Sequence, residues 1–328
     1  MSLMMVLETL LRWAGFIGVI ILLLLLDLKL FSRDGSPSSI KKAVGMALMW
    51  ILFALLFNLF IFSSMGLHSG IEFLTASILE YSLSLDNLFV MLLIFQSFRV
   101  PKEYQHKVLF WGIIGVIIMR GFFIIIGSAL IRQFEWLFYV FGTVLLYSGI
   151  RTLRDDKESF NPQDNLIVRL VRKLFPVSND SRGGRFFLFE RGRLVFSTLF
   201  VTLLVIEFTD LVFAFDSIPA IFGVTTDPFI IFTSNIFAVL GLRSLYFILA
   251  RLGEIFKYLN KGLSLILIFI GIKMILSEFI NVPTEVSLSV LLAIIVFSIS
   301  LSLIMSPGPG LLPLQKKAPK ASRLNSRK

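Results

Sequence analysis

The stretches LEYSLSLDNLFVMLLIF (79–95) and LLVIEFTDLVFAFDSIPAIF (203–222) place carboxylates inside long apolar runs. The first contains Glu80 and Asp86, and the second contains Glu207, Asp210 and Asp216. An ionised acid at the centre of a membrane helix costs roughly 2.5–3.5 kcal/mol on insertion scales. These acids therefore need a compensating partner, and a cation is the simplest one.

The composition predicts an all-α polytopic membrane protein. Of the 328 residues 56% are hydrophobic, and the mean hydropathy is +0.88. Many runs reach the roughly 20 apolar residues that a helix needs to cross a bilayer. The runs are continuous rather than alternating, which excludes a β-barrel. The chain has no cysteine, so neither a disulfide framework nor a thiolate metal site is possible.

The apolar runs predict about nine transmembrane helices, at 7–30, 41–62, 72–97, 107–131, 134–153, 194–220, 229–250, 258–279 and 284–305. Lys and Arg collect in the odd-numbered loops and in the C-terminal tail, whereas the even-numbered loops carry few of them. Since basic loops stay in the cytoplasm, the N-terminus is predicted outside and the C-terminus inside. The same rule explains the net charge of +10 without a nucleic-acid partner.

Part of the chain reads as a duplication. The segment IIMRGFFIIIGSALI (117–131) resembles AVLGLRSLYFILARL (238–252), so that Arg120 corresponds to Arg243. A Gly-Ile-Arg ending at Arg151 likewise corresponds to a Gly-Ile-Lys ending at Lys273, at an offset of 122 to 123 residues in both cases. Two three-helix copies joined through a cytoplasmic loop have opposite orientations in the membrane, a common transporter design. The alternative is chance similarity between apolar helices.

The chain is expected to divide into six parts: two N-terminal transmembrane helices (1–63), a first three-helix repeat (72–153), a cytoplasmic basic loop (154–193), a second repeat (194–280), a last transmembrane helix (281–305) and a disordered basic cytoplasmic tail (306–328). The loop is interpreted as a mobile connector with a short amphipathic helix at about 166–175, and as a docking surface for a protein partner. The tail is expected to lie near anionic lipid.

The spacing of the acids along each predicted helix shows which of them share a helix face. Glu80 and Asn87 are seven residues apart and share one helix face. Glu207 and Asp210 are i, i+3 neighbours on the second segment. Pro219 removes a backbone donor, so it is expected to kink or unwind the helix a few residues before it and to free carbonyls for a cation.

These residues predict a metal site. The candidate ligands are Glu80, Asp86, Asn87, Glu207, Asp210, Asp216 and Ser217. Their oxygen atoms suit Mn²⁺, Mg²⁺ or Ca²⁺. With no cysteine and no histidine inside a predicted span, Zn²⁺ or Cu⁺ is not expected. Arg120 and Arg243 are interpreted as balancing charge when the site is empty. In the alternative reading, the acids only pair with these arginines to hold the bundle together.

The same stretches resemble the TerC/Alx family of bacterial integral membrane proteins. The matching segments are EYSLSLDNLFV (80–90), VLFWGIIGVIIMR (108–120), the long run 206–249 that begins IEFTDLVFAFDSIPAIFG, and LILIFIGIKMI (265–275). The Alx branch is closest in character, and the resemblance implies manganese export. For the family it also implies links to tellurium resistance, to metal loading of secreted proteins and, in plastids, to membrane protein insertion. The implied site residues are the seven candidate ligands named above.

The resulting hypothesis is a divalent cation exporter of the cytoplasmic (inner) membrane, with Mn²⁺ as the expected ion and Ca²⁺ or Mg²⁺ as less favoured ones. It would work by alternating access between the two repeats, with protonation of some acids coupling export to the proton gradient. No resident cofactor, enzymatic activity or nucleic-acid partner is expected; the partners are the cation and the lipid bilayer. The rival reading is a membrane assembly or metallation factor that docks through its basic loop and tail.

Overall fold

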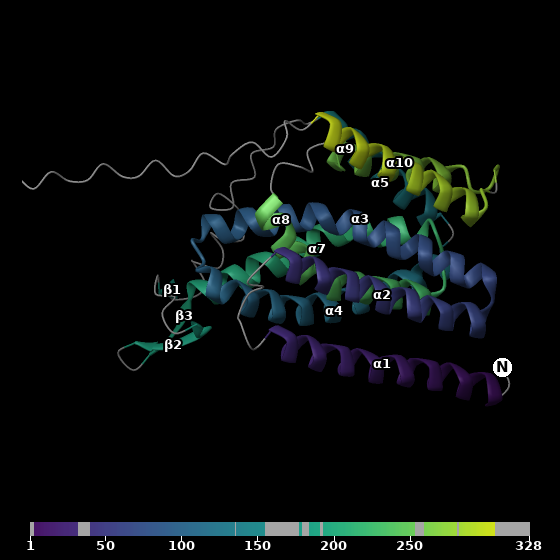
Figure 1. Ribbon diagram of the computed structural model, residues 1–328. Coiled ribbons are helices and arrows are strands. Elements are labelled where there is room, and N and C mark those ends of the chain that lie inside the picture. The colour runs from purple at the N-terminus through teal and green to yellow at the C-terminus, as the bar shows by residue number, and fades with distance from the viewer. Residues whose placement is uncertain are drawn as a thin grey trace, which may run out of the picture.

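The computed structural model describes residues 3–31, 40–134, 136–154, 177–178, 184–190, 193–252, 259–280 and 282–305. Long helices run alongside one another, and a small β-sheet lies at one end of the bundle (Figure 1). The helices are α1 (Leu3–Phe31), α2 (Ile40–Met65), α3 (Leu67–Ser97), α4 (Lys102–Gln133), α5 (Leu137–Arg154), α7 (Thr198–Phe222), α8 (Pro228–Leu252), α9 (Leu259–Ile275) and α10 (Thr284–Met305).

Within the described ranges, seven helices are long and apolar enough to cross a membrane: α1, α2, α3, α4, α7, α8 and α10. Helices α5 and α9 have 18 and 17 residues, so they are only about 26–27 Å long at 1.5 Å per residue. The hydrocarbon core of a bilayer is roughly 30 Å thick. That α5 and α9 also cross the membrane therefore stays a prediction. The orientation of the chain in the membrane stays a prediction too.

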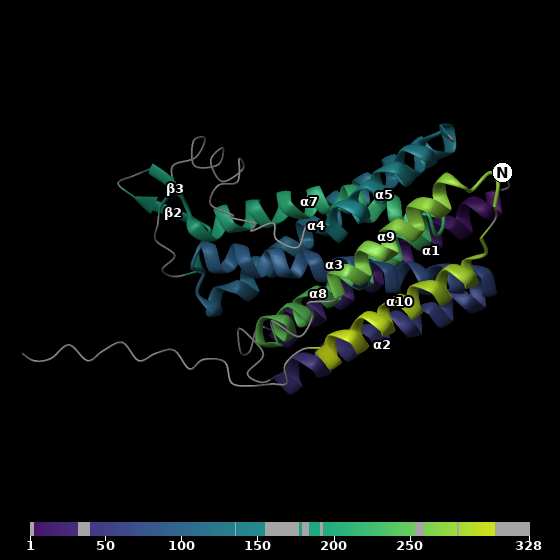
Figure 2. The ribbon, with the colours of Figure 1, turned by 90° about the horizontal axis from the view of Figure 1, so that it is seen from above.

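Helix α8 is the central helix of the bundle, and most of its side chains are buried. It packs against α2, α3 and α4, whereas α1 lies at the edge and contacts α8 (Figures 1 and 2). The core between α8 and its neighbours is built from large side chains such as Trp50, Phe73 and Phe237. This arrangement places polar residues of α8 away from lipid.

Helices α5 and α9 form a tightly packed antiparallel pair. A Cβ at Gly142 of α5 would lie 2.9 Å from the backbone oxygen of Gly271 on α9. Two turns further along α5, a Cβ at Gly149 would lie 2.8 Å from the backbone oxygen of Ser264 on α9. The absence of side chains at these glycines therefore lets the two backbones approach closely, as small residues do in membrane helix pairs.

A three-stranded sheet occupies the region between the two predicted repeats, and the sequence interpretation did not include it. It consists of β1 (Val177–Ser178), β2 (Phe187–Glu190) and β3 (Arg193–Ser197), in the order β1-β3-β2. β2 and β3 pair antiparallel, so that Phe187 faces Phe196. Lys107 of α4 donates to the Gly184 oxygen at 2.7 Å. The amphipathic helix predicted at 166–175 and the tail 306–328 lie outside the described residues.

Two expectations for the second acidic segment need correction. Its helix begins at Thr198 rather than 194, because β3 takes up the preceding residues and Ser197 caps the helix by accepting a hydrogen bond from the Phe200 amide at 3.4 Å. The helix is also not unwound before Pro219, because α7 continues to Phe222, whereas the expected kink stays a prediction. Proline still leaves the oxygen of Phe215 without its usual helical donor, although the chain stays helical there.

Candidate functional site

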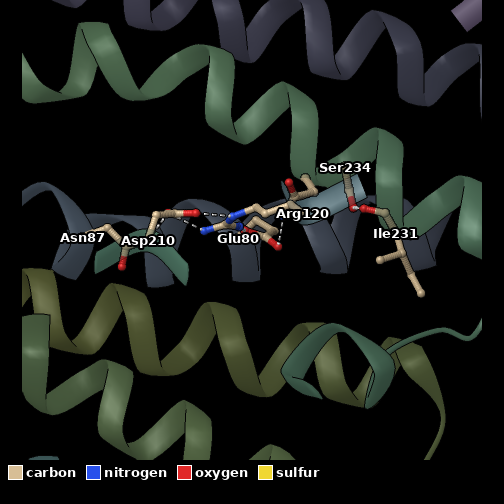
Figure 3. Close-up of polar contacts among 7 residues, drawn as sticks. Glu80, Asn87, Arg120, Asp210, Ile231 and Ser234 are labelled. Carbon is tan, nitrogen blue, oxygen red and sulfur yellow. Dashed lines mark hydrogen bonds and ion pairs between the residues drawn. The ribbon is translucent and has the colours of Figure 1, made fainter. Parts of the chain in front are cut away.

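Arg120 is the centre of a buried polar network. This side chain enters from α4 and is 1% exposed. Its Nη1 donates to Oε2 of Glu80 on α3 at 2.9 Å. Its Nε and Nη2 donate to the two oxygens of Asp210 on α7, both at 3.1 Å. The guanidinium therefore holds Asp210 in a two-point contact and Glu80 in a one-point contact (Figure 3).

Each of the two carboxylates also accepts a hydrogen bond from an amide. Asn87 Nδ2 donates to Oδ1 of Asp210 at 3.2 Å, and Asn235 Nδ2 donates to Oε1 of Glu80 at 2.6 Å. The network thus joins α3, α4, α7 and α8. All five side chains are nearly inaccessible. With both acids ionised, the two carboxylates and one guanidinium carry a net charge of −1.

The spacing of residues along α3 explains why Glu80 and Asn87 both reach this network. Glu80 and Asn87 lie two turns apart on the same face of α3, the face that meets α7 and α8. Asn87 and Asp210 are 123 residues apart, which is the offset that relates Arg120 to Arg243. The acidic segments of the two predicted copies therefore contact each other directly.

Glu207 lies one turn before Asp210, against two glycines of α4. A Cβ at Gly115 would overlap the Glu207 carboxyl group, and one at Gly112 would lie 3.7 Å from Oε1. The glycines therefore make the room that this carboxyl group occupies. Oε2 of Glu207 is buried and has no hydrogen-bond partner among the described residues. A buried carboxyl oxygen without a partner is costly unless a proton or an ion compensates it.

Asp216 takes part in a different contact. It is half-buried and accepts a hydrogen bond from Ser148 Oγ of α5 at 2.8 Å. Six residues separate it from Asp210, about 9 Å along the helix axis. Ser217 beside it is buried, and its hydroxyl has no partner within the described ranges. The side chain of Asp86 lies outside the described part of the chain.

The second arginine has different surroundings from the first. Arg243 of α8 is 1% exposed, contacts the backbone oxygen of His106 at 3.5 Å and lies 5.5 Å from the ring centre of Phe110. Together with Gly112 and Ile206 it lines a cavity of about 10 Å³, the lower limit for a single water molecule. It therefore sits at the same α4–α7 contact as Glu207.

The predicted ligands do not form one cage in this conformation. Among the described side chains, no group of three or more His, Cys, Asp or Glu residues is placed to hold a metal ion. Glu80, Asn87 and Asp210 come together around Arg120, Glu207 lies on the α4 side, and Asp216 and Ser217 lie further along α7. The role of the seven residues as metal ligands remains a prediction. The role of the two arginines in balancing charge remains a prediction as well.

With this geometry in hand, the similarity to known proteins decides the family. The model of the integral membrane protein TerC family matches residues 65–308. The chain belongs to the TerC family. It is a multi-pass membrane protein, in agreement with its seven apolar helices.

Related proteins match this chain over most of its length. An uncharacterised membrane protein of Myxococcus xanthus is 45% identical over 90% of this chain and 92% of its own. A protein of Escherichia coli strain K12 named "Putative membrane-bound redox modulator Alx" is 40% identical over 88% of this chain and 92% of its own. Its namesake in Salmonella typhi is also 40% identical, with the same coverage. No solved structure matches the chain.

Two participants in this TerC-family site were not among the predicted site residues. Asn235 was not a candidate ligand, yet it makes the shortest contact to Glu80. A polar amide within the apolar run 228–240 was the available signal. Gly115 was not singled out, because the sequence does not show which glycine faces an acid on another helix.

Proposed function

We propose that this protein transports a divalent cation across the cell membrane, with Mn²⁺ exported from the cytoplasm as the expected substrate. The observation that carries the proposal is the pair of carboxylates from α3 and α7 held around a buried cationic group (Figure 3). The groups available there are carboxylate and amide oxygens, which Mn²⁺, Mg²⁺ and Ca²⁺ accept as ligands. In this proposal Arg120 occupies the place of positive charge while no ion is bound.

Binding then requires an exchange of cations. The carboxylates of Glu80 and Asp210 would turn from the Arg120 guanidinium to the incoming ion, and the amide oxygens of Asn87 and Asn235 would become available as further ligands. Two buried carboxylates without a cation are costly, so Arg120 stays paired with them until an ion replaces it. The motion needed is a side-chain rearrangement together with movement of α4 relative to α3 and α7.

Charge balance suggests a role for Glu207 in this exchange. Glu80, Asp210 and Arg120 sum to −1, so a bound divalent ion raises the sum to +1. Oε2 of Glu207 is buried without a partner in the described structure. Ionisation of Glu207 would bring the charge sum to zero. Release of the ion would be accompanied by return of a proton to Glu207. Proton-coupled export is therefore the form of transport that the charges favour.

The proposed transport cycle uses the two repeats as moving parts. Support comes from Asn87 and Asp210, which lie in the acidic segments of the two predicted copies and contact each other. Further support comes from the antiparallel crossing of α5 and α9, the third helices of the two copies. A substrate site at the interface of inverted repeats is the arrangement expected for alternating access.

The Escherichia coli relative is named a redox modulator. Such a name is compatible with a protein that changes the redox state of the cell indirectly. The present chain has no cysteine, so it has no thiol with which to carry out disulfide exchange. We therefore attribute any redox effect of this protein to the metal ion it transports.

The test is the manganese content of cells. Cells that lack the endogenous protein and are grown in excess Mn²⁺ should retain more manganese with Glu80→Gln or Asp210→Asn than with wild type, because each variant removes one anionic ligand. Glu285→Gln is the matched control, since Glu285 is an exposed acid in the first turn of α10. With equal membrane levels, wild-type manganese content in both site variants would contradict the proposal.

A further inference from the structure

A second polar cavity lies apart from the Arg120 network, at the end of the bundle where α1 begins. Its volume is about 520 Å³, within the range of small-molecule binding sites. It is lined by residues from α1, from the end of α2 and from the start of α8, including Thr9, Arg12, Trp13, Thr226, Asp227 and Phe229. In Figure 1 this is the end at which the N-terminus is marked.

The two sides of the cavity carry opposite charges. Arg12 of α1 is partly exposed and lines the cavity. Asp227 precedes α8, and its Oδ1 accepts the Phe229 amide at 2.8 Å. That hydrogen bond orients the carboxylate and leaves Oδ2 for a ligand. The cavity thus offers a guanidinium fork for an anion and a carboxylate oxygen for a cation.

The depth of the cavity indicates where its ligand comes from. Arg12 lies about three turns into α1, which begins at Leu3, and so near one end of this membrane-spanning helix. Arg and Trp at this depth are typical of the interface between hydrocarbon and headgroups. The ring of Trp13 packs edge-on against Phe229, with centroids 5.2 Å apart. Beyond it, Leu10 and Ile17 of α1 are at least half exposed, as expected of lipid-facing side chains.

We propose that this cavity binds the headgroup of a zwitterionic phospholipid with a primary ammonium, of the phosphatidylethanolamine class. Arg12 donates to the lipid phosphate, and Oδ2 of Asp227 accepts from the ammonium. Trp13 and Phe229 supply the apolar wall beneath the headgroup. A lipid held there connects α1 to the start of α8, two elements that otherwise meet at the edge of the bundle.

The experiment uses purified full-length protein, stripped of lipid in detergent, and measures the shift in melting temperature on titration with phosphatidylethanolamine, phosphatidylglycerol or inorganic phosphate. Wild type should respond to phosphatidylethanolamine at concentrations at least about tenfold lower than to phosphatidylglycerol. Arg12→Gln should weaken the response to both lipids about tenfold or more. Asp227→Asn, which can still cap α8, should abolish the preference between them.

Arg154→Gln is the matched control, because Arg154 is an exposed arginine at the end of α5, away from the cavity. It should behave as wild type does. The proposal is overturned if Arg12→Gln and Asp227→Asn both respond to the two lipids as wild type does. It is also overturned if inorganic phosphate alone stabilises wild type as strongly as the lipid, since the cavity would then bind a free anion.

Discussion

Replacing Arg120 by Met should destabilise the protein strongly, because it leaves two acids without their shared cation. Glu80 and Asp210 are 0% and 2% exposed, so water cannot take over the role of the guanidinium. Breaking a buried ion pair from one side costs about 3–5 kcal/mol. Since every 1.4 kcal/mol is a factor of ten, the ratio of folded to unfolded protein should fall by roughly a hundredfold to several thousandfold.

The same reasoning predicts a rescue. Adding Glu80→Gln and Asp210→Asn to Arg120→Met removes the buried negative charges while keeping the shapes of the side chains. Replacing a whole buried ion cluster by neutral groups of similar volume is often close to neutral, so the triple variant should recover most of the lost stability. The assay is unfolding in mixed micelles, followed by circular dichroism as denaturing detergent is added.

Two results would refute this account of the network. One is an Arg120→Met variant within about 0.5 kcal/mol of wild type, the range typical of inconsequential surface substitutions. The other is a triple variant no more stable than Arg120→Met alone, which would mean that the arginine acts through packing rather than through charge.

Three further outcomes follow from the packing of the helices. Gly142→Leu should lower the melting temperature by several degrees or prevent folding, because its side chain meets the backbone of α9; Gly15→Leu, where no atom lies within 4 Å of an added Cβ, should not. Gly115→Ala should displace the carboxyl group of Glu207 and reduce manganese efflux in cells severalfold, with folded protein still visible by size-exclusion chromatography. Asn235→Ala should cost about 1.5–3 kcal/mol in the micelle unfolding assay, the value of a hydrogen bond to a charged group.

The sequence alone predicts the helical bundle and its acidic segments well, because apolar runs and acids within them are local features. Asp210 and Glu80 stand out in the sequence without knowledge of their neighbours. Which helices meet is a non-local property. The contacts of Asn235 with Glu80 and of Gly115 with Glu207 depend on how α8 and α4 are rotated. No periodicity in one helix reports the rotation of another.

Two local features were also misjudged. The segments FLFE (187–190) and RLVFS (193–197) form paired strands, where a basic connector leading into a helix at 194 was expected. Pro219 was expected to kink or unwind α7, but the helix continues past it without unwinding. In a membrane, neighbouring helices and side chains supply the packing that keeps a proline-containing segment helical.

Manganese flux into proteoliposomes tests the central claim most directly. Purified protein is reconstituted into vesicles that contain a dye quenched by Mn²⁺, and external Mn²⁺ is added with an imposed proton gradient. Wild-type vesicles should show quenching that saturates with Mn²⁺ concentration, and Asp210→Asn vesicles should match protein-free vesicles. Wild-type vesicles that take up no more Mn²⁺ than protein-free ones, or an Asp210→Asn variant that transports like wild type, would contradict transport through the Glu80–Arg120–Asp210 network.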